Sequence, residues 1–261
     1  FLEKIGVTKG QKYICLVARD SAYKKSISGL FERPLEDLIH NYRNSNIDDY
    51  KLAVNFLLDR GYFVIRMGNV VEKKLKIDHK NFLDYASSDL KSSFLDFFLL
   101  GNSYFNLVSE AGIKDVSYIY NVPYVFVNCP FPKITINWHK SVFIYKKFKS
   151  RKLNRYLTFS EFDKKMDINN DVNKTKIVGS YGYVCFSNND LDIEIIDNTP
   201  EEIKMATKEM LLRMEKNLWK DSYSDLESKF WNNFPFDSIL HSVKNRSRVC
   251  NEYIVKNSNF L

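Results

Sequence analysis

Arginines that end apolar runs are the side chains in this sequence best suited to hold a phosphate. Arg19 ends one such run, and Arg66 ends another, directly before a turn at Gly68. A guanidinium can give a diphosphate two parallel hydrogen bonds, so both arginines are candidate phosphate-binding residues. For Arg19, the alternative is a surface arginine that pairs with Asp20 or Asp37.

A turn of small residues is the second candidate for phosphate binding. Ser109-Glu110-Ala111-Gly112 lies between an apolar run and a helical pattern. Small residues let the backbone approach a ligand, and a helix amino end offers N–H groups to phosphate. An ordinary strand-to-helix turn would have the same composition. The chain has neither G-x-G-x-x-G nor G-x-x-x-x-G-K-[ST], which argues against a dinucleotide oxidoreductase and a P-loop enzyme.

A cluster of hydrogen-bonding side chains precedes another helical pattern. It consists of His40, Tyr42, Arg43 and Asn44. Asn46 or Ser45 can cap the helix that follows, and within the cluster itself capping accounts for only one position, Asn44 or Ser45. Substrate contact and structural hydrogen bonding are equally consistent with the other residues.

The sequence has one weak signal for a metal site, because Asp190-Leu191-Asp192 has the D-x-D spacing that could chelate a divalent ion between nucleotide phosphates. Such triplets are common by chance, and this one lies in an expected surface turn. His79, His139 and His241 do not have metal-ligand spacing with one another or with cysteine. The four cysteines are widely separated and form no C-x-x-C pair, which favours buried free thiols in a reducing cytosol. We therefore expect no metal.

Alternating strands and helices must position these residues. Short apolar runs predict five strands, and helical patterns lie between several of them. This alternation predicts an α/β fold with a Rossmann-like, doubly wound parallel sheet and flanking helices. The strands are expected at residues 12–19, 62–65, 81–84, 104–108 and 123–127, and the helices at 47–58, 90–100 and 113–120.

The carboxyl edge of this sheet is the expected binding site. Right-handed crossovers place the carboxyl ends of parallel strands on one edge. Open α/β sheets bind their ligands at that edge. The candidate residues that end or follow strands should therefore gather there, namely Arg19, Arg66, Asp84 and residues 109–112.

The later part of the chain has a clear helix start but weaker strand patterns. From residue 128 to 152 we expect an extended loop and then a basic-aromatic segment. Residues 181–187 and 191–196 are expected to form two strands or a hairpin. Thr199, followed by a proline and two acids, predicts a helix that runs to about Trp219. Residues 200–261 are predicted to be a helical extension of a single domain that spans residues 1–261.

The net charge of +7 over 261 residues favours anionic partners. One segment, which begins at Lys140 and ends at Arg155, has seven Lys or Arg, no acid and interleaved aromatic residues. Such a segment is typical of an anionic membrane surface, a nucleic-acid-binding surface or a solvated face. No nucleic-acid-binding module accompanies it, so we favour contact with a membrane or lipid-linked acceptor at the cytoplasmic face.

Eight segments along the chain form an ordered series. They are VARDSAY (17–23), HNYRN (40–44), RGYFVIRMG (60–68), FLDYASSDLKSSFLDFFL (82–99), SEAG (109–112), NVPYVFVN (121–128), YLTFSE (156–161) and NTPEEI (198–203). This series resembles a family of bacterial glycosyltransferases from surface-polysaccharide and O-antigen gene clusters. The resemblance extends from about Gly6 to about Met214.

The resemblance implies a glycosyltransferase of the GT-B class, in which two Rossmann-like domains face each other. The carboxyl-terminal domain of such an enzyme holds the nucleotide-sugar, and this chain would be that donor-binding half, with the acceptor domain largely missing. The first strand is also similar to the H-x-R motif of fucosyltransferase-like enzymes, whose arginine contacts the donor diphosphate. Arg19 matches that arginine, and Val17 stands where the motif has histidine.

The implied reaction transfers a sugar from a nucleotide-diphosphate sugar to a surface-polysaccharide or lipid-linked acceptor, without a cofactor. Arg19, Arg43 and Arg66 would neutralise the departing diphosphate. From its position, Asp20 or Glu110 would act as general base or contact the sugar. The alternative is a non-catalytic domain that binds nucleotide or phospholipid, and a weaker one is nucleic-acid binding.

Overall fold

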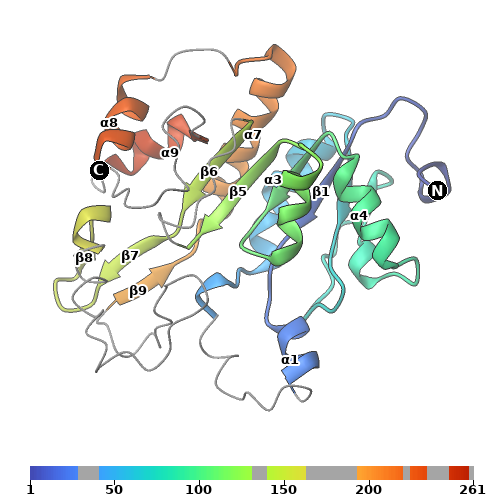
Figure 1. The fold of residues 1–261 in the computed structure, drawn as a ribbon, viewed down its shortest axis with the longest axis horizontal. Coiled ribbons are helices and arrows are strands. Elements are labelled where there is room, and N and C mark those ends of the chain that lie inside the picture. The colour runs from blue at the N-terminus through green and yellow to red at the C-terminus, as the bar shows by residue number, and fades with distance from the viewer. Residues whose placement is uncertain (29–40, 131–139, 163–192, 220–223, 234–246, 259–261) are drawn as a thin grey trace.

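A parallel β-sheet runs through the middle of the protein (Figure 1). The computed structural model describes residues 1–28, 41–130, 140–162, 193–219, 224–233 and 247–258. Within these residues the sheet has seven strands, in the order β10-β6-β5-β4-β1-β2-β3. They are β1 (Tyr13–Val17), β2 (Phe63–Arg66), β3 (Phe82–Leu83), β4 (Phe105–Val108), β5 (Tyr124–Cys129), β6 (Ser141–Tyr145) and β10 (Arg248–Val249).

The strand order reverses beside β1, at the centre of the sheet. Ile14 of β1 pairs with Val64 of β2 on one side and with Phe105 of β4 on the other, and all paired strands are parallel. From β3 to β6 the order is 3-2-1-4-5-6, which is the order of doubly wound dinucleotide-binding sheets. The predicted Rossmann-like sheet is therefore confirmed, and its switch point lies between β1 and β4.

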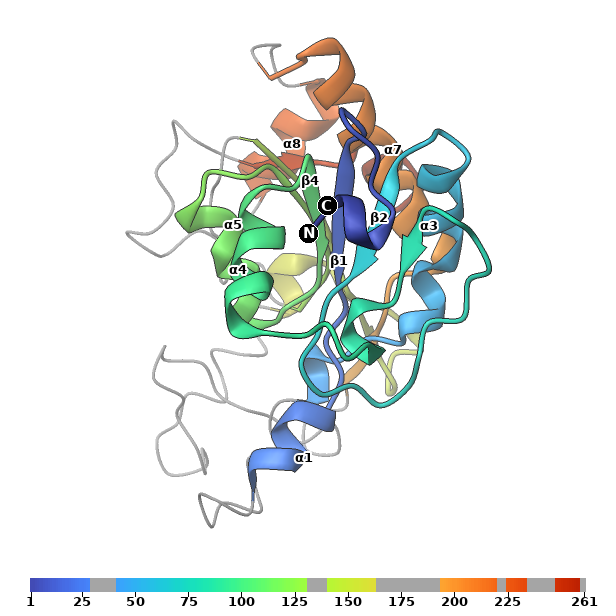
Figure 2. The same cartoon turned by 90° about the vertical axis from the view of Figure 1, so that its right-hand side faces the viewer.

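Helices cover both faces of the sheet (Figure 2). Alternate residues of each strand point to opposite faces, so each face has its own apolar cluster. One face packs against α3 (Lys51–Leu58) and α7 (Pro200–Lys216). The other packs against α4 (Ser93–Gly101) and α5 (Val116–Ile119). The predicted helix at 47–58 begins as a 3₁₀ turn, Ile47–Tyr50, and continues as α3.

The basic-aromatic segment differs from its expected form, because much of it lies in the core. After β6 it continues into β7 (Lys147–Ser150), which pairs antiparallel with β8 (Arg155–Tyr156) and β9 (Ile193–Ile196). Phe143, Tyr145 and Phe148, which would have faced a membrane or nucleic acid, are buried. Lys146 and Lys147 interrupt the apolar pattern of the segment, so its sequence does not predict these strands. Membrane contact stays a prediction, and it now depends on the exposed residues 151–155.

The carboxyl-terminal part adds to the sheet as well as to its helical layer. Helix α7 starts where expected and ends at Lys216, three residues before the predicted end, because Asn217 adopts a left-handed conformation with φ 54°. Beyond it lie α8 (Asp225–Asn233) and α9 (Asn251–Lys256), and β10 between them pairs with β6. Residues 181–187, predicted as a strand, lie outside the described residues.

The first turn of α7 is closed by a reciprocal capping box. The Thr199 hydroxyl accepts the N–H of Glu202 at 3.2 Å, and the Glu202 carboxylate accepts the N–H of Thr199 at 2.9 Å. We expect Thr199→Ala to lower the free energy of unfolding by about 1 kcal/mol, measured by urea denaturation. Thr199→Ser keeps the hydroxyl and should retain most of the stability. Equal losses in the two variants would contradict the capping role.

Candidate active site

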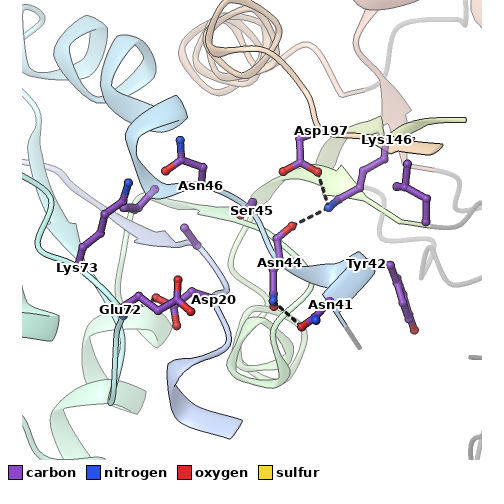
Figure 3. Close-up of a pocket in the computed structure, with 13 residues that line it drawn as sticks. Asp20, Asn41, Tyr42, Asn44, Ser45, Asn46, Glu72, Lys73, Lys146 and Asp197 are labelled. Atoms are coloured by element: carbon purple, nitrogen blue, oxygen red, sulfur yellow. Dashed lines mark hydrogen bonds and ion pairs between the residues drawn. The ribbon is translucent and has the colours of Figure 1, made fainter. Parts of the chain in front are cut away.

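A pocket of about 450 Å³ opens at the carboxyl edge of the sheet, beyond β1 and β6 (Figure 3). Figure 3 shows Lys146 and Asp197 on one side of it and Asp20, Glu72 and Lys73 on the other. Its lining comes from the end of β1, from residues 41–47 and from three further segments. The lining residues are Ala18, Asp20, Asn41, Tyr42, Asn44, Ser45, Asn46, Ile47, Glu72, Lys73, Lys146, Ile195 and Asp197.

Arg19 lies next to this pocket, at the switch point of the sheet. Its backbone N–H donates to the Ser109 hydroxyl at 2.8 Å, and the Ser109 N–H donates to the Val17 carbonyl at 2.8 Å. These bonds join the carboxyl ends of β1 and β4, as the strand pattern predicts. Burial and then the neighbouring Arg43 lower the pKa of Arg19 to about 10. The guanidinium therefore stands close to another cation in a partly desolvated position.

Arg43 and Glu110 form an ion pair beside Arg19. Arg43 Nη2 lies 3.4 Å from Glu110 Oε1, and Lys114 Nζ lies 3.5 Å from the same oxygen. Glu110 is only 6% exposed and does not line the pocket. Its other oxygen, Oε2, has no hydrogen-bond partner among the described residues. Glu110 is thus placed as a buried counter-ion to two cations.

Lys146 is a buried cation at the pocket wall that the sequence did not predict as a site residue. It is 2% exposed, and its Nζ donates to the Asn44 carbonyl at 2.7 Å and to Asp197 Oδ1 at 2.6 Å. Burial lowers the pKa of Lys146, Asp197 opposes this effect, and Arg19 adds to it. We call Arg19, Arg43 and Lys146 the switch-point cations, because each is electrostatically coupled to another of the three.

Asp20 lines the pocket, but its carboxylate accepts hydrogen bonds from backbone N–H groups. Oδ1 accepts the Ala22 N–H at 3.0 Å, at the start of α1 (Ala22–Ser28), and Oδ2 accepts the Glu72 N–H at 2.9 Å. Both oxygens therefore fix the loops that form one wall of the pocket. These two hydrogen bonds explain the presence of a carboxylate at position 20 without a role in proton transfer.

Arg66 and Asp84 are brought together by the fold, but not at the pocket. Arg66 is 0% exposed, and its Nη1 lies 3.1 Å from Asp84 Oδ1. Asp84 Oδ2 accepts the Leu75 N–H at 2.9 Å and the Ser87 hydroxyl at 3.1 Å. Neither residue lines the pocket, and together they fasten the connection that follows β2.

Gly68, another predicted site residue, has a backbone conformation and close neighbours that require a glycine. Its φ is 153°, and a Cβ there would lie 2.8 Å from Val71 Cγ1 and 3.2 Å from the Ala86 Cβ. A side chain would therefore clash with this same connection. The geometry explains the glycine through packing rather than through approach to a ligand.

The turn after β4 is tighter than expected. The Ala111 N–H donates to the Ser109 carbonyl at 2.7 Å, so this amide already has a partner. Gly112 begins a 3₁₀ turn, Gly112–Asp115, and α5 behind it has only four residues. Such a short helix does not present the row of free N–H groups that was expected for phosphate.

The polar patch at 40–44 is divided by the structure. Tyr42 and Asn44 line the pocket, while Arg43 turns to Glu110. Asn46, one of the expected capping residues, caps the following 3₁₀ turn by accepting the Asp48 N–H at 3.3 Å. His40 lies outside the described residues.

Asp197 is another pocket residue that the sequence did not predict as a site residue, and a buried amide pair positions it. The Asn128 N–H donates to Asn198 Oδ1 at 2.6 Å, and the Asn198 N–H donates to Asn128 Oδ1 at 2.7 Å. Asn198 Nδ2 also donates to the Tyr145 carbonyl at 2.6 Å. Asp197 is thereby held at the ends of β5 and β6. A conspicuous helix start directly follows it, which was the one available signal.

The described residues contain neither a candidate metal site nor a candidate membrane-spanning helix, and Asp190 and Asp192 lie outside them. No group of three or more His, Cys, Asp or Glu side chains is arranged to bind a metal ion there. None of the helices in the described ranges combines the length and apolarity needed to cross a membrane.

Comparisons of the chain with protein-family models, with curated proteins and with solved structures find no match.

Proposed function

We propose that this chain is the nucleotide-sugar-binding domain of a glycosyltransferase. The reaction would move a sugar from a nucleotide-diphosphate sugar to a surface-polysaccharide or lipid-linked acceptor. Two features support the proposal: the ordered sequence series from residue 17 to residue 203, and a 3-2-1-4-5-6 sheet whose edge carries a pocket next to its switch point. Sheets of this order bind nucleotides at that place.

The convergence of the switch-point cations is the observation that carries the proposal. Burial lowers the pKa of both Arg19 and Lys146, and repulsion from a neighbouring cation lowers each of them further, while Glu110 and Asp197 oppose these effects. A bound diphosphate would offset this repulsion. It would gain most when the sugar leaves, because negative charge then accumulates on the phosphate oxygens.

The roles in this proposal follow from position. Arg19 and Arg43 bind the diphosphate, and Lys146 contributes positive potential from the pocket wall. Asp20 and Glu110 are engaged with backbone and with cations respectively, so the proposal gives neither of them the role of general base.

The test is a nucleotide screen followed by a charge-removal variant. Thermal-shift measurements with UDP, GDP, dTDP and their sugars should identify a nucleotide that stabilises the protein. Isothermal titration calorimetry should then show that Arg19→Ala weakens binding of that nucleotide diphosphate by about 10- to 100-fold, since a hydrogen bond to a charged group contributes roughly 1.5–3 kcal/mol.

Arg60→Ala is the matched control. Arg60 is an exposed arginine between α3 and β2, at the amino edge of the sheet. Its replacement by alanine removes the same charge as Arg19→Ala. The affinity of the Arg60→Ala variant for the nucleotide should stay within about twofold of the affinity of the unchanged protein. Equal affinities in Arg19→Ala and the unchanged protein would refute the proposed role of Arg19.

A second candidate function is a non-catalytic domain that binds a nucleotide or a phospholipid headgroup. It is favoured by Val17 in place of the motif histidine and by the engagement of both candidate bases, Asp20 and Glu110. Release of nucleotide diphosphate from a nucleotide-sugar separates the two functions. Binding without any release, even with added acceptor glycans, would favour the non-catalytic domain.

A further inference from the structure

The walls of the pocket carry three carboxylates against two lysines, unlike the adjacent Arg19 and Arg43. Its two lysines are already paired: Lys146 with Asp197 at 2.6 Å, and Lys73 with Asp48, which lies outside the lining. Asp20 and Glu72 add two further carboxylates. A phosphate inside the pocket would meet these negative charges at close range. The pocket is therefore suited to an uncharged group.

Two of the pocket carboxylates each have an oxygen free for a ligand. Asp197 Oδ1 accepts Lys146, and Glu72 Oε1 accepts Ser21 and Lys25. Among the described residues, Asp197 Oδ2 and Glu72 Oε2 have no hydrogen-bond partner. The side chains of Asp197 and Glu72 are 37% and 49% exposed, so a ligand can reach them. Carboxylate oxygens accept strong hydrogen bonds from hydroxyl groups.

The remaining lining combines amides with apolar surface. Asn41, Asn44 and Asn46 offer groups that can donate or accept, while Tyr42 and Ile195 offer apolar surface. Hydroxyl-rich rings need both kinds of contact, because they have polar rims and apolar faces. The volume of about 450 Å³ falls within the range of small-molecule sites.

The pocket adjoins Arg19 and Arg43 along two short stretches of chain. Asp20 follows Arg19 directly, and Tyr42 and Asn44 flank Arg43. A ligand whose diphosphate lies between the two arginines can therefore extend into the pocket without a change in the fold.

We infer that this pocket binds the sugar of the donor, with Asp197 and Glu72 accepting hydrogen bonds from its hydroxyl groups, while the diphosphate lies outside it at Arg19 and Arg43. The inference rests on the proposed function and adds to it a separate sugar subsite. Asp197 is the principal anchor, because the Asn128–Asn198 pair holds it in place.

The test compares each nucleotide diphosphate with its sugar conjugate by isothermal titration calorimetry. The pairs are UDP with UDP-glucose and UDP-N-acetylglucosamine, GDP with GDP-mannose and GDP-fucose, and dTDP with dTDP-glucose. The dissociation constant of the diphosphate, divided by that of its sugar conjugate, gives the contribution of the sugar to binding. Asp197→Asn and Glu72→Gln should each reduce this ratio by about tenfold. Asp78→Asn, an exposed acid outside the pocket, should leave it unchanged.

The outcomes separate this inference from the proposed function. If Asp197→Asn and Glu72→Gln weaken the diphosphate and its sugar conjugate by the same factor, the sugar subsite is wrong although nucleotide binding stands. If no nucleotide binds the unchanged protein, the proposed function fails. Saturation-transfer NMR with free glucose, mannose, fucose and N-acetylglucosamine then tests the sugar subsite by itself. Sugar signals that are present with the unchanged protein and lost in Asp197→Asn support the subsite. The absence of any signal at millimolar sugar overturns it.

Discussion

Asp84→Ala should lower the free energy of unfolding by about 3–5 kcal/mol, because it leaves a charged guanidinium buried without its partner. Arg66 is 0% exposed, and Asp84 is the acid that pairs with it, at 3.1 Å. Two of the Arg66 nitrogens, Nε and Nη2, have no hydrogen-bond partner among the described residues, so nothing there would compensate for the loss. The substitution also removes the acceptor of the Leu75 N–H. Urea denaturation followed by circular dichroism measures the effect.

A double variant distinguishes this structural role from the ligand-binding role that the sequence predicts for Arg66 and Asp84. Arg66→Met with Asp84→Ala removes both charges, and an apolar replacement of a buried ion pair is often close to neutral. We therefore expect the double variant to be more stable than Asp84→Ala and to bind nucleotide diphosphate with unchanged affinity. A large loss of affinity in a folded double variant would place Arg66 in the binding site after all.

Glu227→Ala should have an effect of similar size at the opposite end of the sheet, again about 3–5 kcal/mol of unfolding free energy. Glu227 in α8 is 1% exposed. Its carboxylate accepts Arg248 Nη1 at 3.1 Å and the Val249 N–H at 3.0 Å, which ties α8 to the edge strand β10. Alanine would leave both donors without this acceptor in a buried place. Urea denaturation gives the magnitude.

Glu227→Gln is the informative control for this position. An amide keeps one acceptor of the same reach but lacks the charge, so the loss should be clearly smaller than for alanine. If alanine and glutamine are equally destabilising, the charge of Glu227 is what matters and its hydrogen bond to Val249 is not. If neither destabilises, α8 does not hold β10 in place as described. Nucleotide affinity should be unchanged in both, because Glu227 does not line the pocket.

The sequence by itself determined the central strands and the start of α7. Strands β1, β2, β4 and β5 are short, uniformly apolar runs, and buried parallel strands have this pattern whatever their neighbours. The α7 start depends on Thr199, Pro200 and Glu202, which are consecutive or nearly so. Local signals of this kind need no knowledge of the rest of the fold. The parallel order of the strands then placed Arg19 and Ser109 together at one edge.

Only the tertiary structure decided which charged residues pair with each other, and therefore where the pocket lies. Arg66 and Arg19 look alike in sequence, since each ends an apolar run. Asp84 pairs with Arg66 and keeps it buried, whereas Arg19 lies beside the pocket with Arg43 and Lys146. Lys146 and Asp197 are 51 residues apart, yet they meet at 2.6 Å. Partners so distant in sequence leave no periodic signal, because their contact arises from the antiparallel pairing of β7 with β9, in which Lys147 lies opposite Ile196.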